Sequence, residues 1–215
     1  ELPFVNRLPF ISKTTKIGSA GSCFAAEIAK YLQHNQYNYV VTESVPNPMS
    51  GVFCDLYDHN DPYSPFCAQY GILFNTPSFT QLAEKAFDKR TFKKTLIRDP
   101  VFQRYIDPFR EAVWFNSPDS FMANYESHKS AIKEALMACE VFIVTLGLNE
   151  AWQLKDGTFA SRNPRGNASH LFNHRTLTVQ ENVDYLQRFN EIVREFNPNI
   201  KLIVSVSPVP FLATG

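Results

Sequence analysis

A short strand runs into a glycine-containing turn in the stretch Lys16-Ile-Gly-Ser-Ala-Gly-Ser-Cys-Phe-Ala25. Beyond the turn, apolar residues recur at the spacing i, i+4, i+7 and i+8 of a helix that faces a core. They are Phe24, Ile28, Tyr31 and Leu32. Residues 37–42 (YNYVVT) then have the aromatic and β-branched content of a second strand. This order predicts a strand–turn–helix–strand unit.

Two apolar runs in the second half of the chain predict buried strands. They are residues 141–146 (VFIVTL) and residues 202–206 (LIVSV), and such continuous runs are typical of strands covered on both faces. A helical stripe from about Ser127 precedes the first run, and another over residues 180–196 precedes the second. Helices that alternate with apolar strands indicate a mostly parallel sheet. We therefore predict the α/β class, as a three-layer α/β/α sandwich.

Residues 43–115 lie between these halves and are predicted to form an irregular insertion within a single domain that spans residues 1–215. Long ordered loops are uncommon unless they serve a site. Within the segment, the pattern predicts a short helix over residues 78–87 that is capped by Ser78. It also predicts a hairpin over residues 95–115, which Asp99-Pro100 and Asp107-Pro108 interrupt.

The composition excludes several classes of protein. Hydrophobic residues make up 44% and charged residues 20% of the 215 residues, which is typical of a globular domain. The 21 Lys and Arg residues balance the 21 Asp and Glu residues, so nucleic acid is not expected as a partner, nor is a polybasic membrane surface. No apolar run reaches the roughly 18 residues that a membrane span needs.

The cysteines favour a reducing compartment. Cys23, Cys54, Cys67 and Cys139 show no paired zinc spacing and are too few for a disulfide scaffold. We therefore expect reduced thiols in a cytoplasmic protein, with one Cys54–Cys67 bridge left open. No metal-ligand spacing and no phosphate-binding glycine loop occurs, so neither a metal nor a cofactor is predicted. The chain begins with Glu1 rather than Met, and we expect that it is truncated, above all at its C-terminus.

Polar residues follow the predicted strands at the point where each strand ends. Ser22 and Cys23 follow the first strand, while Asn149 and Glu150 follow the strand that ends at Leu146, with Trp152 close behind. Because ligands of open α/β sheets bind outside the carboxyl ends of the strands, these residues are expected to form one site. The oligomeric state cannot be predicted from these patterns.

Four segments resemble signatures of the GSCFA family, a branch of the SGNH (GDSL-like) hydrolase superfamily. In the family's order, they are Gly21-Ser-Cys-Phe-Ala25, Gly71-Ile-Leu-Phe-Asn-Thr-Pro77, Thr145-Leu-Gly-Leu-Asn-Glu-Ala-Trp152 and Val206-Ser-Pro-Val-Pro210. The resemblance covers most of the chain. It implies a flavodoxin-like sandwich, and hydrolases of this kind cleave ester-linked acyl groups, often from carbohydrates.

The same resemblance implies roles for single residues. Asn149 in Gly147-Leu-Asn-Glu150 matches the superfamily's G-x-N-[DE] block, whose asparagine completes the oxyanion hole together with a glycine amide. Gly71 is the candidate glycine by its order in the chain. A late D-x-x-H block supplies the base, but nothing similar follows Val206, so the base is expected beyond Gly215. His174 is the best local substitute, in a loop, whereas His34 and His128 are expected to face solvent.

The nucleophile is ambiguous between two neighbours. Aligned without a gap, the superfamily's G-D-S falls on Gly21-Ser22-Cys23 and puts Cys23 in the nucleophile's place; aligned by residue type, Ser22 takes it. A thiol at a helix N-terminus has its thiolate favoured by unpaired amides. A serine needs a base within hydrogen-bond reach. Both residues stay candidates.

Each candidate also has a structural interpretation. Ser22 is then only a helix N-cap, worth about 1 kcal/mol, and Cys23 a small buried side chain. Asn149 and Glu150 would cap a helix that begins at Ala151. On this interpretation, Trp152 belongs to the core or a pocket wall, and Gly71 is a turn glycine with positive φ.

We predict an SGNH-type acyl-ester hydrolase or O-acyltransferase that acts on a glycan or a small oxygen ester. Ser22 or Cys23 attacks the carbonyl, Asn149 and the Gly71 amide stabilise the oxyanion, and Glu150 orients Asn149. The alternative is a non-catalytic glycan-binding or assembly module that retains the fold.

Overall fold

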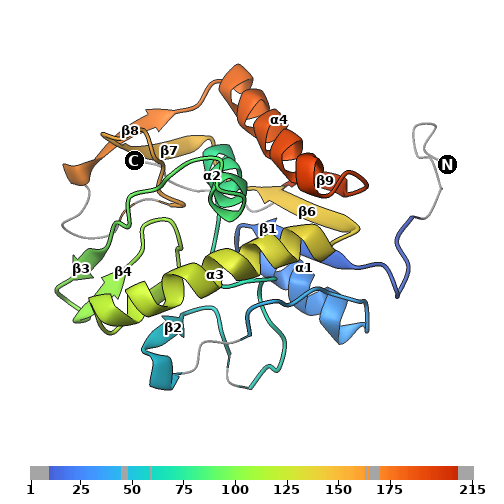
Figure 1. Cartoon of the computed structure of the whole chain (residues 1–215), viewed down its shortest axis with the longest axis horizontal. Helices are drawn as coiled ribbons and strands as arrows, with labels where there is room; N and C mark the ends of the chain where they lie inside the picture. Colours follow the sequence, from blue (N-terminus) through green and yellow to red (C-terminus); the bar gives the residue numbers. More distant parts are fainter. Residues whose placement is uncertain (1–9, 45–47, 59, 163, 165–169, 208–215) are drawn as a thin grey trace.

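A parallel sheet forms the centre of the molecule (Figure 1). The computed structural model describes residues 10–44, 48–58, 60–162, 164 and 170–207. The sheet has the order β1–β6–β9, with β1 (Ile17–Gly21), β6 (Val141–Leu146) and β9 (Lys201–Val206). The register pairs Gly21 with Thr145 and Leu146 with Val206. Because the strands are parallel, their carboxyl ends therefore meet at one edge of the sheet.

Four helices are seen in the described residues: α1 (Cys23–His34), α2 (Thr76–Ala86), α3 (Pro118–Ala138) and α4 (Val179–Phe196). The predicted α/β class is thus confirmed. The helix predicted from Ser127 in fact begins at Pro118, because Ser117 and Ser120 form a capping box ahead of it. The expected cap of α2 is also wrong. Asn75 caps this helix by accepting a hydrogen bond from the Ser78 N–H at 3.1 Å.

The main core lies between the sheet and the helices. Buried side chains from α1, α2, α3, α4 and the strands form one cluster, which includes Ala29, Phe79, Ile132, Phe142 and Phe189. Phe79 of α2 meets Phe189 of α4 edge to face, with ring centroids 6.4 Å apart. Helix α2 therefore belongs to the main core although it lies within residues 43–115. In the part of the chain described, no helix is long and apolar enough to cross a membrane.

Residues 43–115 are more regular than expected. After a short 3-10 helix (Pro48–Ser50), β2 (Val52–Cys54), β3 (Ile97–Asp99), β4 (Arg104–Ile106) and β5 (Val113–Phe115) form an antiparallel sheet in the order β2–β5–β4–β3. This sheet shares a small second core with α3, made of Val52, Val113, Phe115, Phe121 and Tyr125. The helix predicted over residues 78–87 is present as α2, and the hairpin predicted over residues 95–115 is present as β3, β4 and β5. The prediction of an irregular segment is wrong for β2, which joins this sheet.

The strand predicted over residues 37–42 is reduced to one bridge. Tyr39 pairs with Ile17 in the parallel sense, on the side of β1 opposite β6. Two backbone hydrogen bonds hold it: the Ile17 N–H donates to the Asn38 carbonyl at 2.9 Å, and the Val40 N–H donates to the Ile17 carbonyl at 2.8 Å. A further antiparallel pair follows β6, formed by β7 (Glu150–Leu154) and β8 (Phe172–Thr176).

His128 ties α3 to the start of the 43–115 segment. It was expected to face solvent, but its side chain is 1% exposed and its Nδ1 lies 2.6 Å from Glu43 Oε2. Burial lowers the pKa of His128 to about 3, and the charge of Arg110 acts in the same direction. Burial raises the pKa of Glu43, but the hydrogen bond and charge of His128 outweigh it and lower that pKa to about 2. At neutral pH a neutral His128 therefore donates to the Glu43 carboxylate.

This pair makes the fold sensitive to acid. Both pKa values are lower in the folded chain than the ordinary 6.5 and 4.5, so the unfolded chain binds more protons as the pH falls. Stability is lost below pH 6.5 through His128 and below pH 4.5 through Glu43. We expect His128→Gln, which keeps an N–H donor, to flatten the slope between pH 6.5 and 4.5 by about 1.4 kcal/mol per pH unit.

Urea unfolding at a series of pH values measures this slope. His34→Gln is the matched control, because His34 is exposed and its replacement should leave the slope unchanged. Equal slopes for the wild type and His128→Gln would show that His128 does not titrate as described.

Candidate functional site

Ser22 joins β1 to α1 at the carboxyl edge of the sheet. It occupies the N-cap position with extended backbone angles, φ −70° and ψ −176°, but its side chain makes no capping hydrogen bond. The residue is 2% exposed, and its Oγ is buried with no partner in the described residues. The interpretation of Ser22 as a simple N-cap is therefore wrong. A buried hydroxyl without a partner costs about 1–3 kcal/mol, which calls for an explanation other than stability.

Cys23 is the first residue of α1 and is exposed. The interpretation as a small buried side chain is therefore wrong. The other thiols are further from solvent: Cys54 is half-buried, while Cys67 and Cys139 are buried. All four cysteines are free, so the Cys54–Cys67 bridge that the sequence left open is not formed. Cys23 is thus the thiol that a solute can reach most easily.

Gly147 brings the end of β6 against Ser22. A Cβ at this glycine would lie 2.8 Å from Phe74 Cδ1 and 3.5 Å from Ser22 Cβ. The Phe74 carbonyl accepts hydrogen bonds from the N–H groups of Gly147 at 3.1 Å and Leu148 at 2.9 Å. A side chain at this position would have to displace the Phe74 ring and would touch Ser22. The turn after β6 is therefore held directly beside the turn after β1.

Gly71 opens the segment that leads to Phe74. The Leu73 N–H donates to the Gly21 carbonyl at 2.8 Å, so this segment lies along the end of β1. Gly71 itself has a φ of +71°, and a Cβ here would collide with the Glu111 carbonyl. These two facts are sufficient to explain a glycine at this position. Its role in an oxyanion hole stays a prediction.

Asn149 and Glu150 follow Gly147 but cap no helix, because β7 begins at Glu150. Asn149 is exposed, and its carbonyl accepts a hydrogen bond from the Leu177 N–H at 2.7 Å. Two residues of extended chain span at most about 7 Å. Asn149 therefore lies within that distance, along the chain, of the glycine that contacts Ser22.

Trp152 and His174 face each other across the β7–β8 pair. They are opposite in the register, with ring centroids 5.1 Å apart. The expectation that His174 lies in a loop is wrong, since it belongs to β8. Trp152 is half-buried and so fits a wall beside the site better than a position in the core.

The structure thus brings Ser22, Cys23 and Asn149 to one edge of the sheet. The end of β9 completes this edge, since the Ser207 N–H donates to the Leu146 carbonyl at 2.8 Å. Pro208 and Pro210 of the fourth signature segment lie outside the described residues. Within the described chain, no group of three or more His, Cys, Asp or Glu side chains could hold a metal ion.

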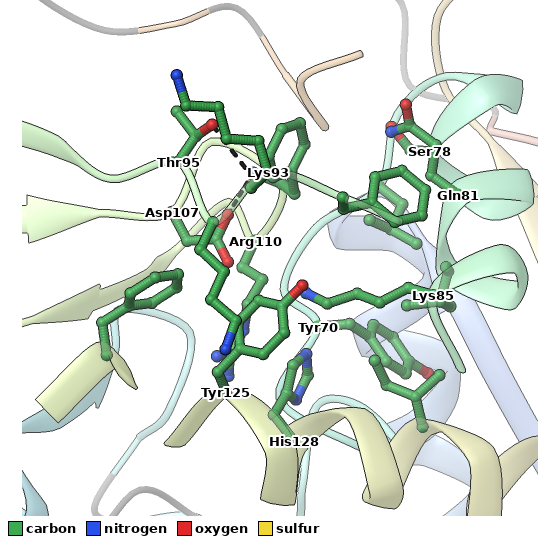
Figure 2. Close-up of a pocket in the computed structure, with 17 residues that line it drawn as sticks. Tyr70, Ser78, Gln81, Lys85, Lys93, Thr95, Asp107, Arg110, Tyr125 and His128 are labelled. Atoms are coloured by element: carbon green, nitrogen blue, oxygen red, sulfur yellow. Dashed lines mark hydrogen bonds between the residues drawn. The ribbon is translucent and has the colours of Figure 1, made fainter. Parts of the chain in front are cut away.

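Sequence reasoning missed a cavity on the other side of the Gly71–Asn75 segment (Figure 2). Leu73, whose N–H binds the end of β1, also lines this cavity, together with Lys85, Asp107, Arg110 and His128. These charged residues come from separate parts of the chain, and no local motif joins them. The nearest signal was the interruption at Asp107-Pro108, which was interpreted as a break in a hairpin.

The family comparison agrees with the arrangement of these segments. The model of the GSCFA family matches residues 16–215, and the chain therefore belongs to the GSCFA family. No curated protein and no solved structure matches the chain.

The unpaired Ser22 hydroxyl leads to a prediction about stability. Replacing it by alanine removes a buried polar group that has no partner, so Ser22→Ala should leave the free energy of unfolding unchanged or raise it by about 1 kcal/mol. Ser117→Ala is the matched control. Its hydroxyl accepts from the Ser120 N–H at 3.1 Å, so its loss should lower stability by about 1 kcal/mol. Denaturant unfolding measures both, and a loss at Ser22 as large as at Ser117 would restore the N-cap interpretation.

Proposed function

We propose that this chain is an SGNH-type acyl-ester hydrolase or O-acyltransferase that acts on a glycan or a small oxygen ester, with Cys23 as its nucleophile. The strand order supports this proposal. With the Tyr39 bridge included, the order across the sheet is Tyr39, β1, β6, β9. After β1 the chain first adds Tyr39 on one side of this strand and later adds β6 and β9 on its other side. In a flavodoxin-like sheet, ligands bind at the carboxyl ends of the strands where the order reverses. Ser22 and Gly147 flank that point.

The connections also support a three-layer sandwich. Parallel crossovers are almost always right-handed. Helix α1 leads from β1 toward Tyr39, whereas α4 leads from β6 to β9 in the opposite direction across the sheet. Right-handed connections in opposite directions place α1 on one face and α4 on the other. This is the arrangement that the SGNH resemblance implies.

One observation carries the proposal: the contact between Ser22 and Gly147, beside an exposed Cys23 and an exposed Asn149. Two segments that are more than a hundred residues apart meet here, and each matches a block of the resemblance. An oxyanion hole needs a polar donor next to the nucleophile. The carboxamide of Asn149 is available for this purpose.

The difference in exposure supports Cys23 over Ser22 as the nucleophile. The Ser22 Oγ is buried beneath the turn, so a substrate would meet Cys23 first. Cys23 also takes the nucleophile's place when G-D-S is aligned without a gap. The Ser22 side chain then lies behind the nucleophile, against Gly147, where it helps to position the turn that carries Asn149.

The reaction proceeds in two steps. In the first, the base removes the Cys23 thiol proton, the sulfur bonds to the ester carbonyl carbon, and the carbon–oxygen bond to the alcohol breaks. The alcohol leaves with the proton from the base, and the acyl group remains as a thioester. In the second step, water or an acceptor hydroxyl attacks the thioester. The base takes the proton of the attacking hydroxyl, the carbon–sulfur bond breaks to release the acyl product, and the base returns the proton to the Cys23 sulfur. His174 is not assigned as this base, because it lies on β8 opposite Trp152.

The first test is to trap the thioester. Incubation with 4-nitrophenyl acetate should add one acetyl group to the chain, which peptide mass spectrometry should find on Cys23. Cys23→Ala should lose the adduct and the burst of nitrophenol, while Ser22→Ala should retain both. Cys54→Ala is the matched control, since Cys54 is a free, half-buried thiol away from this edge, and it should behave as wild type.

Two outcomes would contradict this assignment. An adduct that survives Cys23→Ala but disappears in Ser22→Ala would make the serine the nucleophile. No adduct and no turnover with acyl esters, combined with binding of glycans, would favour the alternative, a non-catalytic glycan-binding module.

The second test addresses Asn149. Asn149→Ala should lower kcat/KM for the acyl ester about a hundredfold or more, because one oxyanion-hole donor is lost. Stability should not change, since the side chain is exposed. Asn173→Ala removes another exposed asparagine, on β8, and should leave kcat/KM at the wild-type value. Equal rates for both variants would exclude Asn149 from the oxyanion hole.

A further inference from the structure

The cavity beyond the Gly71–Asn75 segment lies between α2, α3 and two connecting segments that flank the antiparallel sheet, residues 92–95 and 107–110 (Figure 2). Its walls are largely apolar and include Leu82, Phe92, Phe109, Phe121, Tyr125 and Ile132. It has a cavity volume of about 30 Å³, which is room for about two water molecules. It is therefore a small, well-bounded site.

Arg110 has one guanidinium nitrogen without a hydrogen-bond partner at this cavity. The residue is 2% exposed, its Nε donates to the Gln69 carbonyl at 2.7 Å, and its Nη1 donates to Asn124 Oδ1 at 2.6 Å. The Nη2 group is buried and has no partner in the described residues. Leaving a charged donor unpaired in the interior is costly. An unused guanidinium nitrogen beside a cavity points to an anionic ligand.

Lys85 supplies the second cation. Its side chain extends from α2 toward Tyr125 (Figure 2), and its Nζ lies 4.5 Å from the centre of that ring. Among the described residues, it makes no hydrogen bond or ion pair. Burial lowers the pKa of Lys85 to about 8, so the amine is still mostly protonated at neutral pH. Lys94 approaches the same ring from outside, but it pairs with Glu126 at 3.3 Å.

The buried charges around the cavity set the charge of its ligand. Arg110 and Lys85 are positive, and His128 is neutral. Asp107 is 1% exposed, lines the cavity and accepts a hydrogen bond from the Phe109 N–H at 2.9 Å. Glu43, which His128 binds, is a second carboxylate whose charge acts on both Arg110 and Lys85. The two carboxylates balance the two cations, so the site has no excess positive charge that would favour a dianion over a monoanion. A dianion such as phosphate would be repelled by Asp107 and would lose its hydration against the aromatic walls.

We propose that this cavity binds a small organic monocarboxylate, which Arg110 Nη2 and the Lys85 amine hold by its carboxylate while its short apolar part packs on the aromatic wall. The site is separate from the edge that carries Cys23, and this inference does not depend on the proposed ester chemistry. Charge-assisted hydrogen bonds from two buried cations supply the selectivity for a carboxylate over a neutral isostere.

Binding can be measured by NMR on the chain with labelled arginine side chains. Titration with acetate at constant ionic strength should shift the Nε–Hε signal of Arg110 with saturation. Acetamide, which has the same shape without the charge, should bind at least tenfold more weakly, as should inorganic phosphate. An equal shift with acetamide would overturn the proposal, and so would the absence of a saturable shift with acetate.

Variants assign the binding to these residues. Lys85→Met should raise the dissociation constant for acetate about tenfold or more, and it should fold, because methionine keeps the apolar stem and Lys85 makes no hydrogen bond or ion pair among the described residues. Lys133→Met is the matched control: it removes the same charge from the exposed face of α3 and should leave the constant unchanged. Arg110→Gln, if it folds, should abolish binding. Equal weakening in Lys85→Met and Lys133→Met would show that the carboxylate is attracted by the net charge of the protein and not by the cations at this cavity.

Discussion

The structure depends on the way Phe74 and its neighbours join the ends of β1 and β6. The Leu73 N–H donates to Gly21 at the end of β1, and the Phe74 carbonyl accepts from Gly147 after β6. The parallel register brings these strand ends to one edge, but it does not by itself fix the turns that follow them. Backbone hydrogen bonds to a third segment do so, and the absence of a side chain at Gly147 lets the turns touch. The position of Ser22, Cys23 and Asn149 follows from this junction.

The same segment separates two places where buried polar groups lack a partner. The Ser22 Oγ lies on the side of the sheet edge, and Arg110 Nη2 lies at the cavity that Leu73 also lines. Unsatisfied buried groups are rare in folded proteins, and those that persist call for a specific explanation. At the edge, the explanation that we propose is a turn held in place for chemistry. At the cavity, it is a ligand that completes the guanidinium's hydrogen bonds.

The sequence predicted the elements whose signals are local. Strands β6 and β9 are continuous apolar runs, and α4 carries an apolar stripe behind a Thr178–Glu181 capping box, so both kinds of element could be found without a partner. The burial predicted for β9 is wrong, since Val204 is 50% and Val206 75% exposed. The meeting of the three candidate residues at the sheet edge could also be predicted, because the carboxyl ends of parallel strands must coincide. The motif order then pointed to the GSCFA family, to which the chain belongs.

Features that depend on distant partners could not be predicted. His128 and Glu43 are 85 positions apart. Nothing in the sequence around a helical histidine indicates that its side chain contacts a carboxylate so far away along the chain. The first half of α3 buries Phe121 and Tyr125 against the antiparallel sheet, so its apolar face makes sense only once that sheet exists. The prediction of a strand over residues 37–42 was wrong for the opposite reason. The local strand propensity is high, but only Tyr39 finds a partner and forms a bridge.

The central claim is that the Cys23 thiol and the Asn149 carboxamide serve one acyl group. A crystal structure of the chain with an acetyl group on Cys23 tests this most directly. The account predicts that the thioester oxygen accepts a hydrogen bond from the Asn149 side-chain nitrogen at about 3 Å. A thioester oxygen that points into solvent, with the Asn149 side chain turned away from it, would contradict the account.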